Sequence, residues 1–385
     1  MVAVSSLANL FYLSTMNMEK FPGTKYLRYL GLPLLFGTAR TKEILRINPT
    51  IEPKREEARD VKFFVYDYNA SELTEAELRS VEETFDYKYS NRVSWINIDG
   101  IRKKDVEVIC QHFDVHYLLM EDILSINQRP KMDEADNVLF CLLNMLYFNE
   151  EKGNVEQEQI SIVLGKNFVL SFQEDAKRDV FNPLREKLRI KNSKLRHSGA
   201  DYLCYAMLDL IVDNYFVVME KLGDQIELVE EEVLRRSNKR SLVRINQLRK
   251  ELIILKRNIA PVQDLVAGII RSESELLEDK TIKYFKDVYD HILQAHDLSE
   301  NYRDVIMSLQ DLYVSNVNLK LNEVMKVMAI VTCLLAPATV ISGIFGMNFD
   351  IIPYAHHNWG FYFAIAIMFV VPLLMLYIFK RRGWF

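Results

Sequence analysis

Two long uncharged runs near the carboxyl end constrain the fold of this 385-residue chain more than any other feature. The first holds 19 residues without a charge, Val327 to Phe345, and the second extends from Gly360 to Phe379. A helix of about 20 apolar residues crosses the roughly 30 Å of hydrocarbon in a bilayer. Because only a short loop separates the runs, we expect a hairpin of two transmembrane helices behind a large, charged body.

Basic residues flank both runs on the side away from the connecting loop. Positive charge on short flanking segments marks the cytoplasmic side of a membrane, and the loop 349–359 contains no Lys or Arg. We therefore expect a multi-pass protein of the cell (inner or plasma) membrane, in contact with the lipid bilayer and with both termini in the cytoplasm. The flanking residues are Lys320, Lys326, Lys380, Arg381 and Arg382.

Composition excludes some classes of partner. The net charge is -5 and no segment forms a basic patch, which argues against nucleic-acid binding. The four cysteines lie far apart with no C-x-x-C pair, so neither a disulfide framework nor a zinc knuckle is expected. We predict buried, reduced thiols.

Residues 61–195 have the texture of a mixed α/β domain. β-branched and aromatic residues predict strands, the last of them folded back at Gly165-Lys166-Asn167, and helical spacing predicts two helices. Thr74 and Glu77 fit a capping box at the start of the first helix. The predicted strands are Val61–Tyr68, Val93–Asp99, Val138–Phe148 and Ile160–Phe172, and the predicted helices are Ser71–Phe85 and Lys103–Phe113.

Long helices follow. Ala200–Arg236 and Leu242–Ser272 predict an antiparallel hairpin with a turn at Arg235–Arg240. A third helix begins near Thr281 and continues into the first membrane run, with a heptad-like apolar stripe that needs partners. The stripe comprises Val288, Ile292, Ala295, Tyr302, Ile306, Leu309 and Tyr313.

The expected architecture is an α+β cytoplasmic domain followed by long helices and two C-terminal transmembrane helices. Its predicted parts are an N-terminal extension (1–60), the α/β domain (61–195), a helical hairpin (196–280), a stalk helix (281–326), a first transmembrane helix (327–348), an extracellular loop (349–359), a second transmembrane helix (360–379) and a basic cytoplasmic tail (380–385).

One face of the first membrane helix is polar or small. Such a face suits either close packing against the second span or contact with water. Two spans cannot enclose a conduit, so a water-lined face requires several subunits around an axis. The face comprises Asn322, Met325, Met328, Thr332, Ala336, Thr339 and Gly343, and Asn348 roughly continues its line.

Gly346-Met347-Asn348, at the outer end of the first of two C-terminal spans, resembles the signature of the CorA magnesium transporters. The short loop, the second span and the basic tail are in the matching places, and the resemblance covers about 60–385. Upstream segments also resemble the family: Met120–Lys131, Ala200–Asp209, Tyr284–His291 and Asn322–Met328.

This resemblance implies a funnel-shaped homopentamer that passes Mg²⁺, with Co²⁺ or Ni²⁺ as further ions. Gly346, Met347 and Asn348 would form the selectivity filter, in which five Asn348 side chains accept hydrogen bonds from a hydrated ion. Met325 and Met328 would form an apolar gate. Asn322 would add a polar ring, and the remaining residues of the polar face would line the pore.

The resemblance also implies regulation by Mg²⁺ bound between neighbouring cytoplasmic domains. Carboxylates from two subunits repel each other unless a cation lies between them, so loss of the ion would loosen the closed state. The matching acids are Glu121, Asp122, Asp209 and Asp287, and Asp311 matches an axial acid of the stalk.

Departures from the family pattern keep the ion preference open. Phe345 stands where Tyr is usual, and Asp350 is the only acid in the loop. His356 and His357 are either ordinary loop residues or ligands for a softer metal such as Zn²⁺.

Two alternative functions are a zinc-transporting relative and a non-conducting Mg²⁺ sensor. An enzyme is not expected, because the chain has no phosphate loop, H-E-x-x-H or nucleophile elbow.

Overall fold

The structure is a computed structural model that describes residues 57–174, 179–347 and 357–384. The chain forms two compact units. Unit 1 holds the residues up to Leu222 together with Arg249–Asn301, and unit 2 holds Gly223–Leu248 together with the residues from Tyr302 onward. Most of the predicted extension 1–60 lies outside the described residues, as do Asn348, Asp350 and His356.

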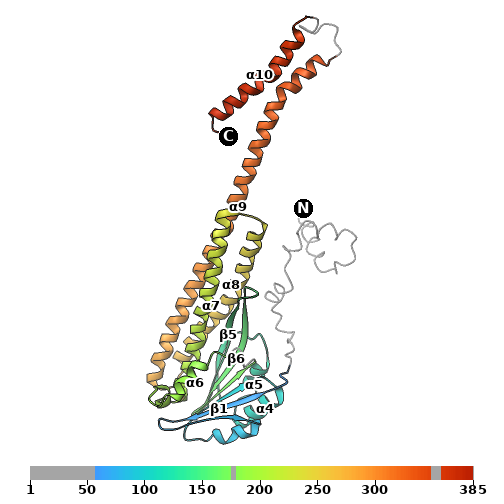
Figure 1. The fold of residues 1–385 in the computed structure, drawn as a ribbon. Helices are drawn as coiled ribbons and strands as arrows, with labels where there is room; N and C mark the ends of the chain where they lie inside the picture. The colour runs from blue at the N-terminus through green and yellow to red at the C-terminus, as the bar shows by residue number, and fades with distance from the viewer. Residues whose placement is uncertain (1–56, 175–178, 348–356, 385) are drawn as a thin grey trace, which may run out of the picture. The chain divides into compact units, whose positions relative to one another are not determined.

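A seven-stranded sheet forms the centre of unit 1, in the order β2-β1-β3-β7-β6-β5-β4 (Figure 1). Strands β3 and β7 are parallel, and every other neighbouring pair is antiparallel. The strands are β1 (Lys62–Tyr68), β2 (Leu73–Leu78), β3 (Val93–Asp99), β4 (Lys131–Ala135), β5 (Val138–Asn149), β6 (Asn154–Leu164) and β7 (Phe168–Gln173).

The four predicted strand runs are confirmed, and the turn at Gly165-Lys166-Asn167 joins β6 to β7. Strand β4, which pairs with β5 across a tight turn, was not predicted from the sequence. Asp136 and Asn137 in that turn both have positive φ angles, 49° and 66°. Asp and Asn tolerate this conformation, which matches the twist of two antiparallel strands.

The predicted helix Ser71–Phe85, with its capping box, is wrong. Leu73–Leu78 is the edge strand β2, and Val81–Tyr87 is the 3₁₀ helix η4. The Asn69 side chain accepts hydrogen bonds from the backbone N–H groups of Ser71 (2.9 Å) and Glu72 (2.7 Å), which turns the chain back along β1. Every residue of β2 pairs with β1. This pairing outweighs the helix propensity of the Glu, Ala and Leu residues in the segment.

Helices cover both faces of the sheet. On one face, α4 (Lys103–His112) and α5 (Tyr117–Leu124) bury Val106, Ile109 and Ile123 against the strands. The other face contacts the unit 1 parts of α7 (Ala200–Arg236) and α8 (Lys239–Arg271). There the Tyr215 hydroxyl donates to the Asn144 carbonyl (2.6 Å), and the Glu251 carboxylate accepts from the Val155 N–H (2.8 Å). The remaining elements before α7 are α6 (Asn182–Arg189) and η6 (Leu195–His197).

The predicted turn between the two long helices is confirmed and lies within unit 2. The Asn238 side chain caps α8 by accepting from the N–H groups of Arg240 (2.7 Å) and Ser241 (3.1 Å). The Glu232 carboxylate accepts from the Ser241 hydroxyl and from Arg244, each at 2.8 Å, and so joins the two helix ends.

The last two helices are α9 (Asp279–Phe345, 67 residues) and α10 (Gly360–Arg381). At 1.5 Å per residue, α9 is about 100 Å long. Among the described residues, α7, α9 and α10 are long and apolar enough to span a membrane. The apolar window of α7 is 56% buried within the protein, whereas those of α9 and α10 are 6% and 0% buried.

Three of the four cysteines, Cys110, Cys141 and Cys204, are buried free thiols, as predicted. The prediction is wrong for Cys333, which is exposed. Cys333 lies in the apolar part of α9, where the described residues of the chain leave most of the helix surface uncovered.

Candidate functional site

The polar face of α9 is exposed along its whole length. All seven of its predicted residues are exposed in unit 2, and Met325 and Met328 expose 65% and 66% of their surface. The described residues of α10 therefore do not cover this face. Of the two options that the sequence left open, packing against the second span and contact with water, the structure does not show the first. The face comprises Asn322, Met325, Met328, Thr332, Ala336, Thr339 and Gly343.

The hydroxyls on this face are satisfied by their own helix. Thr332 donates to the Met328 carbonyl (2.9 Å), and Thr339 donates to the Leu335 carbonyl (3.0 Å). Each Thr therefore needs no second helix for its proton, and its oxygen retains acceptor capacity. A methyl group added at Gly343 would meet nothing within 4 Å among the described residues.

The helix ends at the Gly-Met-Asn motif. The Gly346 N–H donates to the Ser342 carbonyl (2.9 Å) and the Met347 N–H to the Ile344 carbonyl (3.3 Å), so the backbone leaves α9 within these two residues. Asn348 lies outside the described residues.

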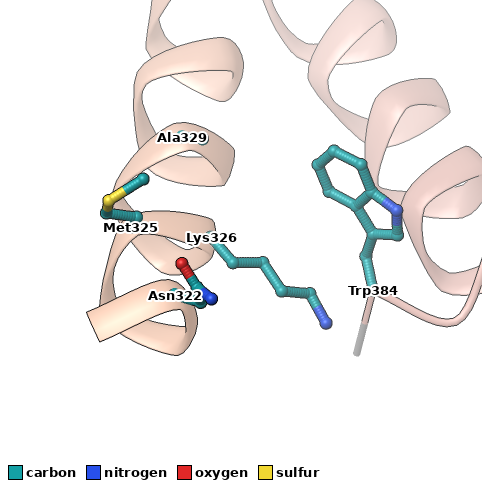
Figure 2. Close-up of a pocket in the computed structure, with 5 residues that line it drawn as sticks. All are labelled: Asn322, Met325, Lys326, Ala329 and Trp384. Carbon is teal, nitrogen blue, oxygen red and sulfur yellow. The ribbon is translucent and has the colours of Figure 1, made fainter. Parts of the chain in front are cut away.

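An open pocket lies at the opposite, Lys-rich end of the apolar segment. It is lined by Asn322, Met325, Lys326, Ala329 and Trp384. Figure 2 shows the Lys326 side chain extending from α9 toward the Trp384 indole, with Met325 on another side of the helix. Lys and Trp are the residues that typically anchor a helix at a membrane–water interface.

The four predicted regulatory acids lie in different surroundings within unit 1, and the predicted stalk acid Asp311 is exposed in unit 2. Of the four, Glu121 and Asp287 are exposed. Asp122 is largely buried and pairs with Lys131, whose amine lies 2.6 Å from the Asp122 carboxylate. The fourth acid, Asp209, is half-buried and accepts from the Tyr205 hydroxyl at 3.3 Å.

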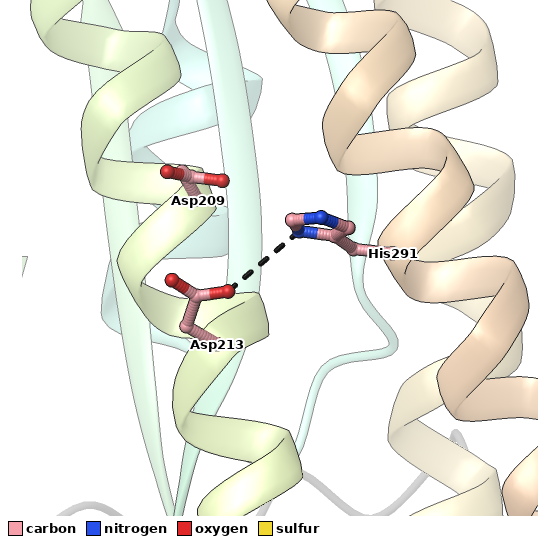
Figure 3. A group of neighbouring side chains, drawn as sticks. All are labelled: Asp209, Asp213 and His291. Atoms are coloured by element: carbon pink, nitrogen blue, oxygen red, sulfur yellow. Dashed lines mark ion pairs between the residues drawn. The ribbon is translucent and has the colours of Figure 1, made fainter.

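Asp209 has two neighbours that were not predicted from the sequence. Asp213 on α7 and His291 on α9 bring their ligand atoms within 4.8 Å of those of Asp209 and of each other (Figure 3). Burial, and secondarily the Asp213 carboxylate, raise the pKa of Asp209 above its usual range. One sequence pattern could have predicted the Asp213 neighbour. Asp209 and Asp213 are four residues apart on one predicted helix, and this spacing places both side chains on one face.

Comparison with known proteins identifies relatives over most of the chain. A family model described as "CorA-like Mg2+ transporter protein" matches residues 90–381. The cobalt/magnesium transport protein CorA of Thermotoga maritima is 39% identical over 326 residues, which are 84% of this chain and 93% of that protein. The cobalt/magnesium transport protein CorA of Methanocaldococcus jannaschii is 25% identical over 76% of this chain and 92% of that protein.

The fold has a matching solved structure. The complete structure of the CorA magnesium transporter from M. jannaschii superposes with a TM-score of 0.70 at 23% identity, over 84% of this chain and 98% of that one. This likeness shows a shared fold. Because the family model matches residues 90–381 and the T. maritima protein is 39% identical over 84% of the chain, the chain belongs to the CorA family of Mg²⁺ transporter proteins.

Proposed function

We propose that this protein is a passive channel for Mg²⁺, with Co²⁺ and Ni²⁺ as further permeant ions, formed by five copies of the chain in the cell membrane. Both termini lie in the cytoplasm. The membrane potential drives cations inward, with about 2.3 kcal/mol per charge for each 100 mV.

The exposed polar face of α9 is the observation that carries this proposal. A membrane helix with hydroxyls, an amide and small residues on one face suits either close packing against another helix or contact with water. The described residues of the same chain leave this face uncovered from Asn322 to Gly343. Five such faces around an axis enclose a water-filled path, whereas one subunit alone cannot.

Selection takes place at a ring of five Asn348 side chains. Mg²⁺ gives up its water reluctantly, and neutral amide oxygens accept hydrogen bonds from the hydrated ion without removing that water. Met325 and Met328 close the path at its cytoplasmic end, since apolar side chains at a narrow point exclude water and ions. Both side chains are exposed in the single chain, as a position at the axis of the oligomer requires.

Regulation uses acids that neighbouring subunits bring together in the cytoplasm. Glu121, Asp122, Asp209 and Asp287 bind Mg²⁺ between subunits and hold the closed state. Asp311 is separate from this site and faces the axis from the stalk. Exposed Glu121 and Asp287 in the monomer are available for a partner subunit.

Ion uptake into proteoliposomes that contain the purified full-length chain tests this function. Mg²⁺, Co²⁺, Ni²⁺ and Zn²⁺ are compared at an imposed inside-negative potential. We expect saturable Mg²⁺ entry that Asn348→Ala abolishes, while Asn358→Ala, a matched change at the Asn just before the second membrane helix, preserves it. Size-exclusion chromatography checks that both variants keep the wild-type oligomer.

Three outcomes would contradict the proposal. No flux of any divalent ion would leave a Mg²⁺ sensor as the function, and flux of Zn²⁺ alone would indicate a zinc transporter. Normal uptake by Asn348→Ala would remove that residue from the selectivity filter.

A further inference from the structure

A basic turn is fastened to α9 within unit 2. Residues 235–240, where α7 turns into α8, contain four basic residues and no acid. The Asn316 amide of α9 donates to the Val233 carbonyl (3.1 Å) and to the Ser237 hydroxyl (3.0 Å). The Lys320 amine of α9 donates to the Ser237 carbonyl (3.3 Å). These hydrogen bonds hold the turn beside one level of α9 (Figure 1).

That level of α9 is close to the apolar segment of the helix. The uncharged run begins at Val327, seven residues after Lys320, which is about 10 Å along the helix. The headgroup layer on each side of the hydrocarbon is about 5–8 Å thick. Electrostatic attraction reaches about 8–10 Å at physiological ionic strength. When α9 crosses a membrane, the turn therefore lies within electrostatic reach of the lipid phosphates.

Three basic side chains at this level have no acidic partner. Lys239 and Arg240 are exposed, and neither forms an ion pair with any residue that the structure describes. Lys320 is exposed as well, and its hydrogen bond goes to a backbone carbonyl, which leaves its charge unbalanced. Arg235, by contrast, is paired with Glu231. Three positive charges are thus available to an anion from outside the chain.

The surface between the turn and α9 is hollowed. Arg235, Asn316 and Lys320 line an open pocket there, so the cationic groups stand around a concave surface rather than on a ridge. Between this pocket and the apolar run, the exposed Glu323 is balanced by Lys326 three residues later. The net charge that faces the membrane at this level is therefore positive.

We propose that the α7–α8 turn, through Lys239, Arg240 and Lys320, binds the headgroups of anionic phospholipids in the cytoplasmic leaflet. This inference rests on the proposed function, in which α9 crosses the cell membrane with the turn on the cytoplasmic side. Basic groups beside a membrane helix attract anionic lipids, and the guanidinium group of Arg suits the phosphate oxygens. Because Asn316 and Lys320 tie the turn to α9, the bound lipid also holds the cytoplasmic end of this helix at a fixed depth.

Lipid binding by the full-length protein in detergent tests the inference. Fluorescently labelled phosphatidylglycerol is titrated with protein and followed by anisotropy, and unlabelled lipids compete. We expect phosphatidylglycerol to compete, and phosphatidylcholine and inorganic phosphate to compete poorly. The double variant Lys239→Gln, Arg240→Gln should bind phosphatidylglycerol about fivefold or more weakly, since each basic residue beside an anionic surface contributes about a factor of five. Lys320→Gln, on the other helix, should weaken binding as well.

The matched control is Arg249→Gln with Lys250→Gln, which removes the same charge from α8 about ten residues beyond the turn. It should bind phosphatidylglycerol as the wild type does, and size-exclusion chromatography checks that all variants keep the wild-type oligomer.

Three results would overturn the inference. One is equal phosphatidylglycerol binding by the wild type and the Lys239, Arg240 variant. Another is equal competition by phosphatidylcholine or by inorganic phosphate, which would show that no anionic lipid is selected. The third is an equal loss of binding in the control variant, which would indicate a general charge effect. No ion gradient is used, and the turn contains no residue of the proposed pore or Mg²⁺ site, so failed ion uptake and failed lipid binding are separate results.

Discussion

The Lys131 amine lies 2.6 Å from Asp122 Oδ2 and 3.0 Å from Asp133 Oδ2. Burial by itself lowers the pKa of this amine, but hydrogen bonds to the two carboxylates raise the pKa above its ordinary value. Asp122 is thus already paired within one subunit. A Mg²⁺ ion that uses Asp122 has to compete with Lys131.

Replacing Lys131 should strengthen regulation by Mg²⁺. In Lys131→Met the Asp122 carboxylate loses its partner, and a partly exposed pair of this kind is worth up to about 1 kcal/mol, or roughly fivefold in affinity. We expect Mg²⁺ to protect the cytoplasmic body from protease at a correspondingly lower concentration. Lys103→Met, which removes an exposed pair with Glu107, is the control. An unchanged or higher Mg²⁺ requirement would argue against Asp122 as a ligand.

Asp209 should make stability depend on pH when no metal is bound. Because its pKa is raised by burial and by Asp213, the folded state favours the protonated acid. This stabilisation is present below the unfolded pKa of about 3.9 and is lost as the pH rises through the higher folded value. Asp209→Asn should therefore raise the Tm at pH 7.5 in chelator, and its advantage over wild type should shrink toward about pH 4.

The control for this pH series is Asp290→Asn, at an exposed acid of α9. It should change the Tm little across the same range. A Tm advantage of Asp209→Asn that grows as the pH falls would contradict the assigned direction of the pKa shift.

A buried amide pair should stabilise unit 1. The Asn144 amide donates to Asn258 Oδ1 at 2.7 Å, and both side chains are at most 5% exposed. Asn258→Ala leaves the Asn144 amide without this acceptor, which should lower the free energy of unfolding by about 1–3 kcal/mol. Thermal unfolding in detergent measures the change. Asn246→Ala, at an exposed Asn of the same helix, should unfold close to the wild-type Tm.

Added bulk should distinguish the two sides of the membrane part of α9. Ala336 lies on the polar face and Ala338 two residues later, about 200° around the helix. If the polar face lines the pore, Ala336→Leu should reduce Mg²⁺ uptake strongly, whereas Ala338→Leu should retain most of it. Proteoliposome flux, normalised to the amount of oligomer, compares the variants. Equal losses of Mg²⁺ uptake in the two variants would argue against the polar face as the pore lining.

Several parts of the fold were predictable because local composition decides them. The runs at 327–345 and 360–379 are too apolar and too free of charge to be stable as exposed helices in water. Local composition also predicted the strands β1, β3, β5, β6 and β7, because their β-branched and aromatic side chains suit a pleated, buried surface. Ser71–Phe85 shows the limit, because pairing with β1 outweighed its local preference.

The sequence by itself determined the family, through Gly346-Met347-Asn348 and the apolar hairpin around it. Only the tertiary structure decided that Asp122 pairs with Lys131, and that His291 meets Asp209 and Asp213, which lie about 80 residues earlier in the chain. A motif or an apolar run consists of neighbouring residues, so the sequence alone predicts it. Contacts between distant residues depend on how α7 and α9 pack within unit 1, which no spacing in the sequence encodes.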